Sequence, residues 1–138
     1  MNAACSPKIQ TEPTAVHPAF TVLNDQINDD KEEFEITMRY FSEDNFVGRP
    51  IPGYNANKAY LTIETKRALL NAHEEFMRLG YRVKIFDAYR PVDVQKKLWD
   101  ILPDANFIAP PEKGSPHSRG VAVDLTLVDS SNKELDMG

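Results

Sequence analysis

The spacing of apolar residues changes repeatedly between residues 34 and 128, and these changes limit the fold class. Apolar side chains at every second position predict strands at 34–41, 81–86 and 121–128. A spacing of three and four predicts a helix at 63–79, and Pro91 marks the first turn of another that reaches Ile101. This mixed order, without a repeated strand-helix-strand unit, predicts an α+β domain with a mixed or antiparallel sheet and helices packed on one face.

Local signals set the limits of the first helix. Thr62 is suited to cap its N-terminus, Glu64 lies in its first turn, and Gly80 is placed to end it. The apolar stripe that we expect to face the core consists of Leu69, Ala72, Phe76 and Leu79.

The chain divides into an arm and a domain. Residues 1–33 contain scattered prolines and end in the polar run "NDQINDDKEE", which predicts an extended or flexible N-terminal arm. Residues 34–138 carry the periodic pattern and predict one domain. A chain of 138 residues is long enough to bury about two-thirds of its unfolded surface.

Charge and hydropathy exclude two classes of partner. The net charge of -5 provides no excess of Lys and Arg to follow a phosphate backbone, so we expect no nucleic-acid partner. A small neutral or zwitterionic ligand fits this charge better. No apolar run approaches the roughly 18 residues that cross a bilayer, so we expect no membrane span.

The predicted strand at 121–128 carries an acid among apolar residues. Its alternation places Val121, Val123, Leu125 and Leu127 on one face and Ala122, Asp124 and Thr126 on the other. Burying a carboxylate within a sheet lowers the stability of the fold by several kcal/mol, as for any buried ion, unless the carboxylate is paired or binds a metal. The strand therefore predicts a partner for Asp124.

The chemistry of the residues alone leaves two interpretations of the partner of Asp124. Gly120 allows a turn that returns His117 to Asp124, and imidazole nitrogen and carboxylate oxygen are both zinc ligands. In the alternative interpretation His117 is an ordinary loop histidine, and Asp124 forms a salt bridge with Arg119 or Arg90.

The pattern around these residues resembles a known signature. The stretch reads as Ser115-x-His117-x-x-Gly120-x-Ala122-x-Asp124 followed by "LTL". It is similar to the zinc signature of the D-alanyl-D-alanine dipeptidases, the family that includes the vancomycin-resistance dipeptidase.

Two further segments agree with this resemblance in chain order. "DAYRP" at 87–91 resembles the arginine motif of the family, and "RYFSEDNFVGRPIPGY" at 39–54 resembles its N-terminal segment. The similarity covers about residues 34–138 and implies a fold like that of the D-Ala-D-Ala metallopeptidases.

The resemblance implies a role for each matched residue. His117 and Asp124 correspond to two ligands of one Zn²⁺, and Arg90 to the cation that stabilises the transition state. Ser115 and Tyr40 correspond to residues that line the substrate pocket. For Arg90, a structural ion pair with Asp87 or Asp93 is the alternative interpretation.

The chain departs from the family at its end. Relatives obtain their third zinc ligand and general base from a later Glu-x-x-His segment, and they use a later aspartate for the substrate's amino group; residues 125–138 contain neither motif. We therefore expect the N-terminal portion of a zinc dipeptidase, inactive as an isolated fragment. A C-terminal fragment or second polypeptide would complete it.

The resemblance implies hydrolysis of the D-Ala-D-Ala dipeptide in cell-wall precursor turnover. Two alternatives remain open: a D,D- or L,D-carboxypeptidase of the same metal group, and a non-catalytic module that binds D-Ala peptides. For localisation we favour the bacterial periplasm over the cytoplasm, with Cys5 as the site of a lipid anchor in one interpretation and an ordinary thiol in the other.

Overall fold

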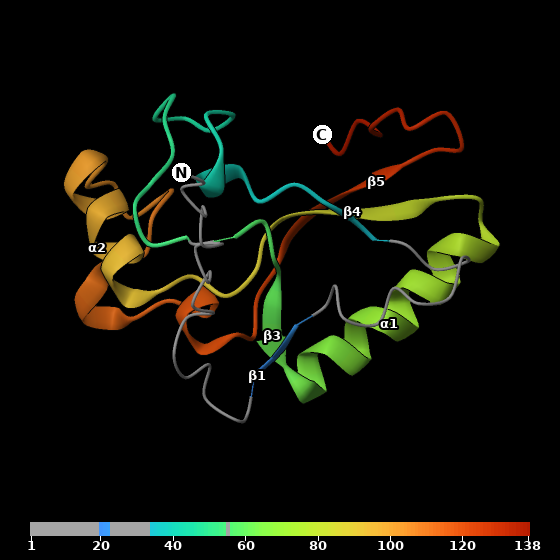
Figure 1. The fold of residues 1–138 in the computed structure, drawn as a ribbon, viewed down its shortest axis with the longest axis horizontal. Helices are drawn as coiled ribbons and strands as arrows, with labels where there is room; N and C mark the ends of the chain where they lie inside the picture. The colour runs from blue at the N-terminus through green and yellow to red at the C-terminus, as the bar shows by residue number, and fades with distance from the viewer. Residues whose placement is uncertain (1–19, 23–33, 55) are drawn as a thin grey trace, which may run out of the picture.

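The computed structural model describes residues 20–22, 34–54 and 56–138 (Figure 1). In chain order the elements are β1 (Phe20–Val22), β2 (Glu35–Ile36), the 3₁₀ turn η2 (Arg39–Phe41), β3 (Tyr60–Thr62), α1 (Ile63–Arg78), β4 (Arg82–Asp87), α2 (Val92–Ile101), the 3₁₀ turns η3 (Pro111–Lys113) and η4 (His117–Arg119), and β5 (Asp124–Val128). The predicted α+β class is confirmed.

The main sheet is mixed, as predicted. Strand β4 lies in its middle, parallel to β2 and antiparallel to β5. Strands β1 and β3 pair antiparallel in a separate two-stranded sheet. Helix α1 packs against β4, β3 and β1, whereas α2 lies at the other end of the molecule (Figure 1).

Two hydrophobic clusters correspond to these two helices. The larger lies between α1 and the sheets and contains Phe34, Met38, Ala59, Leu61, Leu69, Val83, Ile85, Ala88 and Leu127. The smaller joins α2 to loop segments and contains Ile51, Val94, Leu98 and Ile108. Tyr54, in the loop before β3, packs against both clusters.

Helix α1 begins and ends where the sequence predicts. The side chain of Thr62 accepts a hydrogen bond from the Thr65 N–H, and Gly80 follows the helix with φ +85°. The predicted core stripe is wrong at Ala72 and Leu79, which are exposed.

The buried face of α1 contains polar side chains instead. Its buried residues are Lys66, Leu69 and His73. His73 is fully buried; its Nδ1 accepts a hydrogen bond from the Val83 N–H, and its ring stacks on Phe34 with centroids 4.1 Å apart.

Two strands are shorter than predicted because other groups take over their backbone hydrogen bonds. The predicted strand at 34–41 ends at Ile36, since the Met38 N–H donates to the Asn57 side chain and the chain turns into η2. The predicted strand at 121–128 begins at Asp124, because the Val121 N–H donates to the Pro116 carbonyl. Val121 is therefore exposed rather than part of a buried face.

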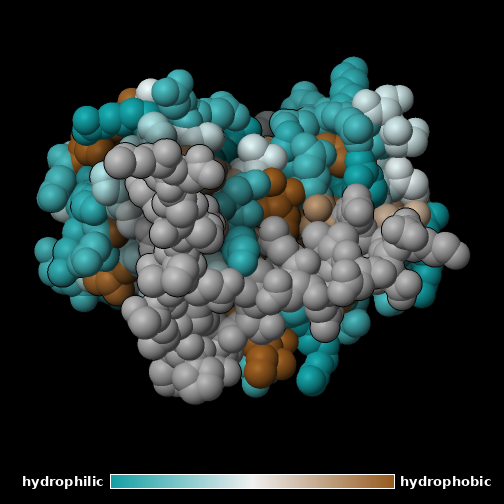
Figure 2. Space-filling view, viewed as in Figure 1, coloured by the Kyte–Doolittle hydropathy of each residue, from teal (hydrophilic) through white to brown (hydrophobic). Residues whose placement is uncertain are grey.

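Most of the predicted arm at 1–33, including Cys5, lies outside the described residues. Within the arm, residues 20–22 form β1. Among the residues that the structure describes, no helix is both long and apolar enough to cross a membrane. On the face shown in Figure 2, hydrophobic residues form separate patches among hydrophilic ones.

Candidate metal and substrate site

Two loops meet at the end of the main sheet. Because β4 and β5 are antiparallel, the start of β5 lies beside the end of β4, and Asp124 is the register partner of Asp87. The Arg90 N–H donates to the His117 carbonyl at 3.0 Å, and His117 Nδ1 lies 2.8 Å from the Ala88 carbonyl oxygen. These contacts bring together the segments 87–90, 117–119 and 124 that the sequence motifs contain.

His117 and Asp124 face one another, as predicted. His117 Nε2 lies 3.3 Å from Asp124 Oδ1. Since the Ala88 carbonyl only accepts hydrogen bonds, Nδ1 carries the ring proton of neutral His117 and Nε2 presents a lone pair. A lone pair and a carboxylate oxygen at this distance need a cation between them, either a proton or a metal ion.

The pKa shifts of the pair express the same requirement. Burial acts to lower the pKa of His117, but the hydrogen bonds to Asp124 and the Ala88 carbonyl outweigh it and raise the pKa. Burial acts to raise the pKa of Asp124, but His117 and Arg90 outweigh it and lower the pKa. The geometry therefore favours a positive charge beside a carboxylate.

The pair fits the geometry of zinc ligands. Two ligand atoms about 2.1 Å from a tetrahedral zinc lie roughly 3.4 Å apart, close to the separation of Nε2 and Oδ1. The hydrogen bond from the second ring nitrogen of His117 to a backbone carbonyl is the support that metal-bound histidines usually have. Asp124 is also half exposed, with a side-chain accessibility of 52%, so its oxygens can be reached from solvent.

Asp87 is the third member of this group and its second acid. Asp87, His117 and Asp124 offer ligand atoms that all lie within 4.8 Å of one another, so they form a group able to hold a metal ion. The oxygens of Asp87 already have partners, however. Oδ1 accepts from the Tyr54 hydroxyl at 2.8 Å, and Oδ2 receives both Nε and Nη2 of Arg90 at 2.9 and 2.7 Å. His117 and Asp124 are therefore the better ligands.

Arg90 is held in the interior beside this group. Its exposed fraction is 7%, and it forms the ion pair with Asp87 that the sequence offered as an alternative. Nη1 donates to Gln95 Oε1 at 2.8 Å, and Nη2 lies 3.6 Å from Asp124 Oδ2. A guanidinium has five N–H groups, so these contacts leave donors on Nη1 and Nη2 that can face a ligand at the His117–Asp124 pair.

The ionic state of this cluster follows from burial. Burial raises the pKa of Asp87, whereas the Arg90 charge and the hydrogen bonds from Tyr54 and Arg90 favour its ionised form. Burial and the neighbouring Asp87 charge raise the pKa of Tyr54, so its hydroxyl keeps its proton and donates.

Asp93, the other ion-pair partner that the sequence offered for Arg90, is exposed and pairs with Lys96 at 4.0 Å.

Ser115 and Tyr40 also lie at the site. The buried Ser115 hydroxyl accepts a hydrogen bond from the His117 N–H at 3.2 Å, which shapes the turn that carries His117. The Tyr40 ring lies 5.1 Å from the Arg90 guanidinium and 6.2 Å from the Tyr54 ring. Their role in binding substrate stays a prediction.

A family model described as D-ala-D-ala dipeptidase, peptidase family M15, matches residues 22–138. The chain belongs to the D-Ala-D-Ala dipeptidase family. The motifs at 39–54, 87–91 and 115–124 therefore identified the family correctly. Members of this family are metallopeptidases, which agrees with the metal-binding group Asp87, His117 and Asp124.

Three curated relatives are similar to the chain. The D-alanyl-D-alanine dipeptidase of Escherichia coli K12 is 37% identical over 106 residues, which are 77% of this chain and 54% of the relative. Those of Enterococcus faecium and Enterococcus faecalis are each 33% identical over 70% of this chain and 57% of the relative. The chain thus spans about half the length of the curated relatives it matches.

Sequence reasoning about this dipeptidase-family chain missed two polar side chains of the site, Tyr54 and Gln95. Tyr54 lies in the segment that resembles the family's N-terminal motif, but the pattern gave it no role. On α2, Gln95 lies next to Val94 and three positions before Leu98, so it is a polar residue on the apolar face of the helix. That position was the signal in the sequence from which a buried polar contact could have been predicted.

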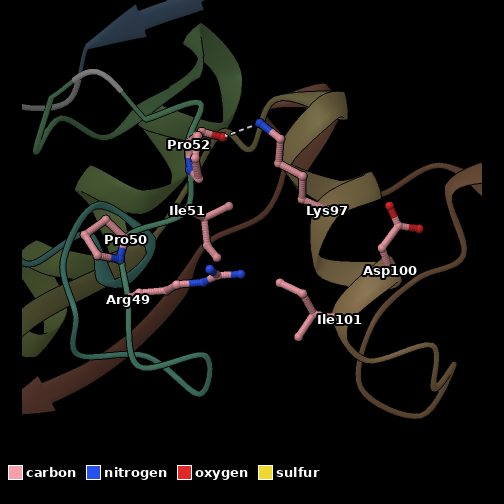
Figure 3. Close-up of a pocket in the computed structure, with 7 residues that line it drawn as sticks. All are labelled: Arg49, Pro50, Ile51, Pro52, Lys97, Asp100 and Ile101. Carbon is pink, nitrogen blue, oxygen red and sulfur yellow. Dashed lines mark hydrogen bonds between the residues drawn. The ribbon is translucent and has the colours of Figure 1, made fainter.

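A pocket on another surface contains none of these residues (Figure 3). It lies between the loop at 49–52 and α2 and is lined by Arg49, Pro50, Ile51, Pro52, Lys97, Asp100 and Ile101. The Lys97 ammonium donates to the Pro52 carbonyl at 2.8 Å across one end of it. Because it lacks His117 and Asp124, we do not place the family's chemistry in this pocket.

Proposed function

We propose that this chain supplies the zinc-binding and transition-state-stabilising part of a D-Ala-D-Ala dipeptidase that acts in cell-wall precursor turnover. The observation that carries the proposal is the 3.3 Å approach of His117 Nε2 to Asp124 Oδ1, with the Arg90 guanidinium 3.6 Å from the same carboxylate. The family match supports the reaction, and this geometry supports the assignment of residues.

Each residue has a defined task in this proposal. His117 Nε2 and Asp124 would hold the zinc, which when bound supplies an activated water and polarises the peptide carbonyl. Arg90 presents its remaining N–H groups where negative charge develops on the carbonyl oxygen, and such donors stabilise the transition state more than the ground state. Tyr40 and Ser115 border the dipeptide on the sides of Arg90 and His117.

Two ligands are fewer than the three that catalytic zinc sites usually have. We propose that the third ligand and the general base come from residues outside those that the structure describes, on a Glu-x-x-His segment like that of the relatives. That segment would belong to another part of the same gene product or to a second polypeptide. His117 and Asp124 alone should hold zinc weakly.

The test is metal analysis together with a hydrolysis assay on the complete gene product. We expect about one zinc per active site and release of free D-alanine from D-Ala-D-Ala. His117→Ala and Asp124→Asn should each lower zinc content and activity by more than tenfold, because loss of a residue that only supports a metal ligand already costs about 10- to 100-fold. Asp93→Asn is the matched control, because Asp93 is exposed and lies outside the site.

Different results separate the proposal from its alternatives. Hydrolysis of a longer stem peptide ending in D-Ala-D-Ala, without hydrolysis of the free dipeptide, would identify a carboxypeptidase. Binding of D-Ala peptides without hydrolysis of either substrate would identify a binding module. Full zinc content in both His117→Ala and Asp124→Asn would refute the assigned ligands.

A further inference from the structure

Gln95 connects Arg90 to the loop between α2 and η3. It lies on α2 with an exposed fraction of 2%. Its Oε1 accepts from Arg90 Nη1 at 2.8 Å, and its Nε2 donates to the Ala109 carbonyl at 2.7 Å. Arginine only donates and a backbone carbonyl only accepts, so these partners determine which way the amide points.

The contact with Asp87 alone leaves Arg90 incompletely fixed. Arg90 Nε and Nη2 both contact the same oxygen, Oδ2, while Oδ1 of Asp87 accepts from Tyr54. A guanidinium that meets two carboxylate oxygens is held as a planar fork, but contacts that converge on one oxygen allow it to turn about that atom. A second anchor on another nitrogen removes this freedom.

We propose that Gln95 is a positioning residue for Arg90. Gln95 binds Nη1, which lies on the side of the guanidinium away from the Asp87 contact. This contact fixes the plane of the guanidinium, and with it the direction in which the remaining N–H groups of Arg90 face the reacting carbonyl. The second hydrogen bond of Gln95 ties this plane to Ala109, in the loop that leads to η3 and His117. The inference rests on the proposed function, in which Arg90 meets the developing oxyanion.

Burial of an amide at this position needs both of its partners. An unpaired buried amide is costly, whereas an apolar side chain of similar length would fill the same space without hydrogen bonds. Gln95 instead satisfies both ends of its amide, with the Arg90 side chain and with the Ala109 carbonyl. Preorganised donors act in catalysis only when their own orientation is held, which is the task that this geometry gives to Gln95.

Two substitutions distinguish positioning from packing. Gln95→Met keeps the length of the side chain but removes both hydrogen bonds. Gln95→Glu keeps an acceptor for Arg90 but buries a carboxylate opposite the Ala109 carbonyl. A packing role predicts that the Met variant is the more active and the more stable. A positioning role predicts that the Glu variant is the more active although it is the less stable.

The experiment uses the complete gene product and measures kcat, KM, zinc content, melting temperature and inhibition by a phosphinate analogue of D-Ala-D-Ala, which mimics the tetrahedral intermediate. We expect Gln95→Met to lower kcat by roughly 10- to 100-fold, comparable to a small misplacement of a catalytic group. Its KM and zinc content should stay within about twofold, and the analogue should bind more weakly by a factor similar to the loss in kcat. Lys96→Met, the exposed neighbour on α2, is the control.

The outcomes separate this inference from the function on which it rests. A wild-type protein that does not hydrolyse the dipeptide refutes the proposed function. An active wild type with Gln95→Met within about twofold in kcat and analogue affinity, or with a change in KM alone, refutes the role of Gln95. If Gln95→Met does not fold, Gln95→Glu decides: kcat within about tenfold of wild type supports the role, and a larger loss refutes it.

Discussion

Gly53 allows the loop before β3 to pass directly over helix α2. Its φ is +130°, and a Cβ added to it would lie 2.4 Å from Cγ2 of Val94, which is fully buried. Gly53→Ala therefore introduces two separate costs, an unfavourable backbone conformation and a collision with a buried side chain.

The magnitude follows from these two costs. A non-glycine residue in a sparsely populated conformation costs about 1 to 3 kcal/mol, and overpacking a core by a methyl group costs about 1 to 3 kcal/mol. We expect Gly53→Ala to lower the free energy of unfolding by about 2 to 5 kcal/mol, allowing for partial relaxation. Gly48→Ala is the matched control: Gly48 has φ +72° but no atom within 4 Å of the added Cβ, so only a backbone cost of about 1 kcal/mol applies.

Urea unfolding followed by tryptophan fluorescence measures these values. The single tryptophan, Trp99, packs against the same cluster as Val94, so it reports on this region. In a Val94→Ala background the collision is absent, and Gly53→Ala should then cost about 1 to 3 kcal/mol less than in the wild type. Equal costs for Gly53→Ala and Gly48→Ala, or no change in the Val94→Ala background, would refute the argument.

Three further predictions follow from other contacts. Arg90→Lys keeps a charge beside Asp87 but loses the separate Nη1 and Nη2 donors of the guanidinium, so kcat of the complete gene product should fall about 10²- to 10³-fold with zinc content unchanged. An unaltered kcat would contradict the role of Arg90. Burial, and then the Arg82 charge, lower the pKa of His73, so the unfolded chain binds more protons below about pH 6.5. The contribution of neutral His73 to the free energy of unfolding should be fully present above that pH and should fall below it by at most about 1.4 kcal/mol per pH unit. His73→Asn should flatten this pH dependence in urea titrations from pH 8 to 5. Thr62→Ala removes the N-cap of α1 and should cost about 1 kcal/mol, measured as the shift of the thermal midpoint in circular dichroism.

Local signals in the sequence predicted the limits of α1 accurately. Thr62 and Gly80 act on the backbone groups next to them, so no distant residue is needed to interpret them. The approach of His117 to Asp124 was predictable for a related reason, because only seven positions separate them and Gly120, with φ +69°, makes the turn between them.

The ends of the strands were not predictable in this way. Asn57 lies 19 residues from Met38, yet its side chain takes the N–H that would have continued β2. The buried His73 likewise depends on Val83, ten positions away on β4. Alternation of apolar residues describes which side chains are buried, but it contains no information on such side-chain bonds to the backbone.

The two interpretations of Arg90 were stated as alternatives, and the structure shows why they do not compete. The ion pair with Asp87 uses only part of the guanidinium, and Arg90 also reaches Gln95 and the neighbourhood of Asp124. The contacts with Asp87 and Gln95 span only three and five positions along the chain, whereas the approach to Asp124 depends on the pairing of β5 with β4, which the sequence pattern does not specify.

The irregular pairing of β4 with β5 between Ile85 and Asp87 places two acids side by side at the edge of a buried sheet. Side chains along a strand alternate between its faces, so inserting or deleting one residue near Asp124 would turn its carboxylate toward the interior. Evolution can therefore change side chains within 82–90 and 120–128 far more readily than it can change the lengths of these segments. Differences in length among related chains should collect in the turn at 129–133, where an added residue moves no group of the site.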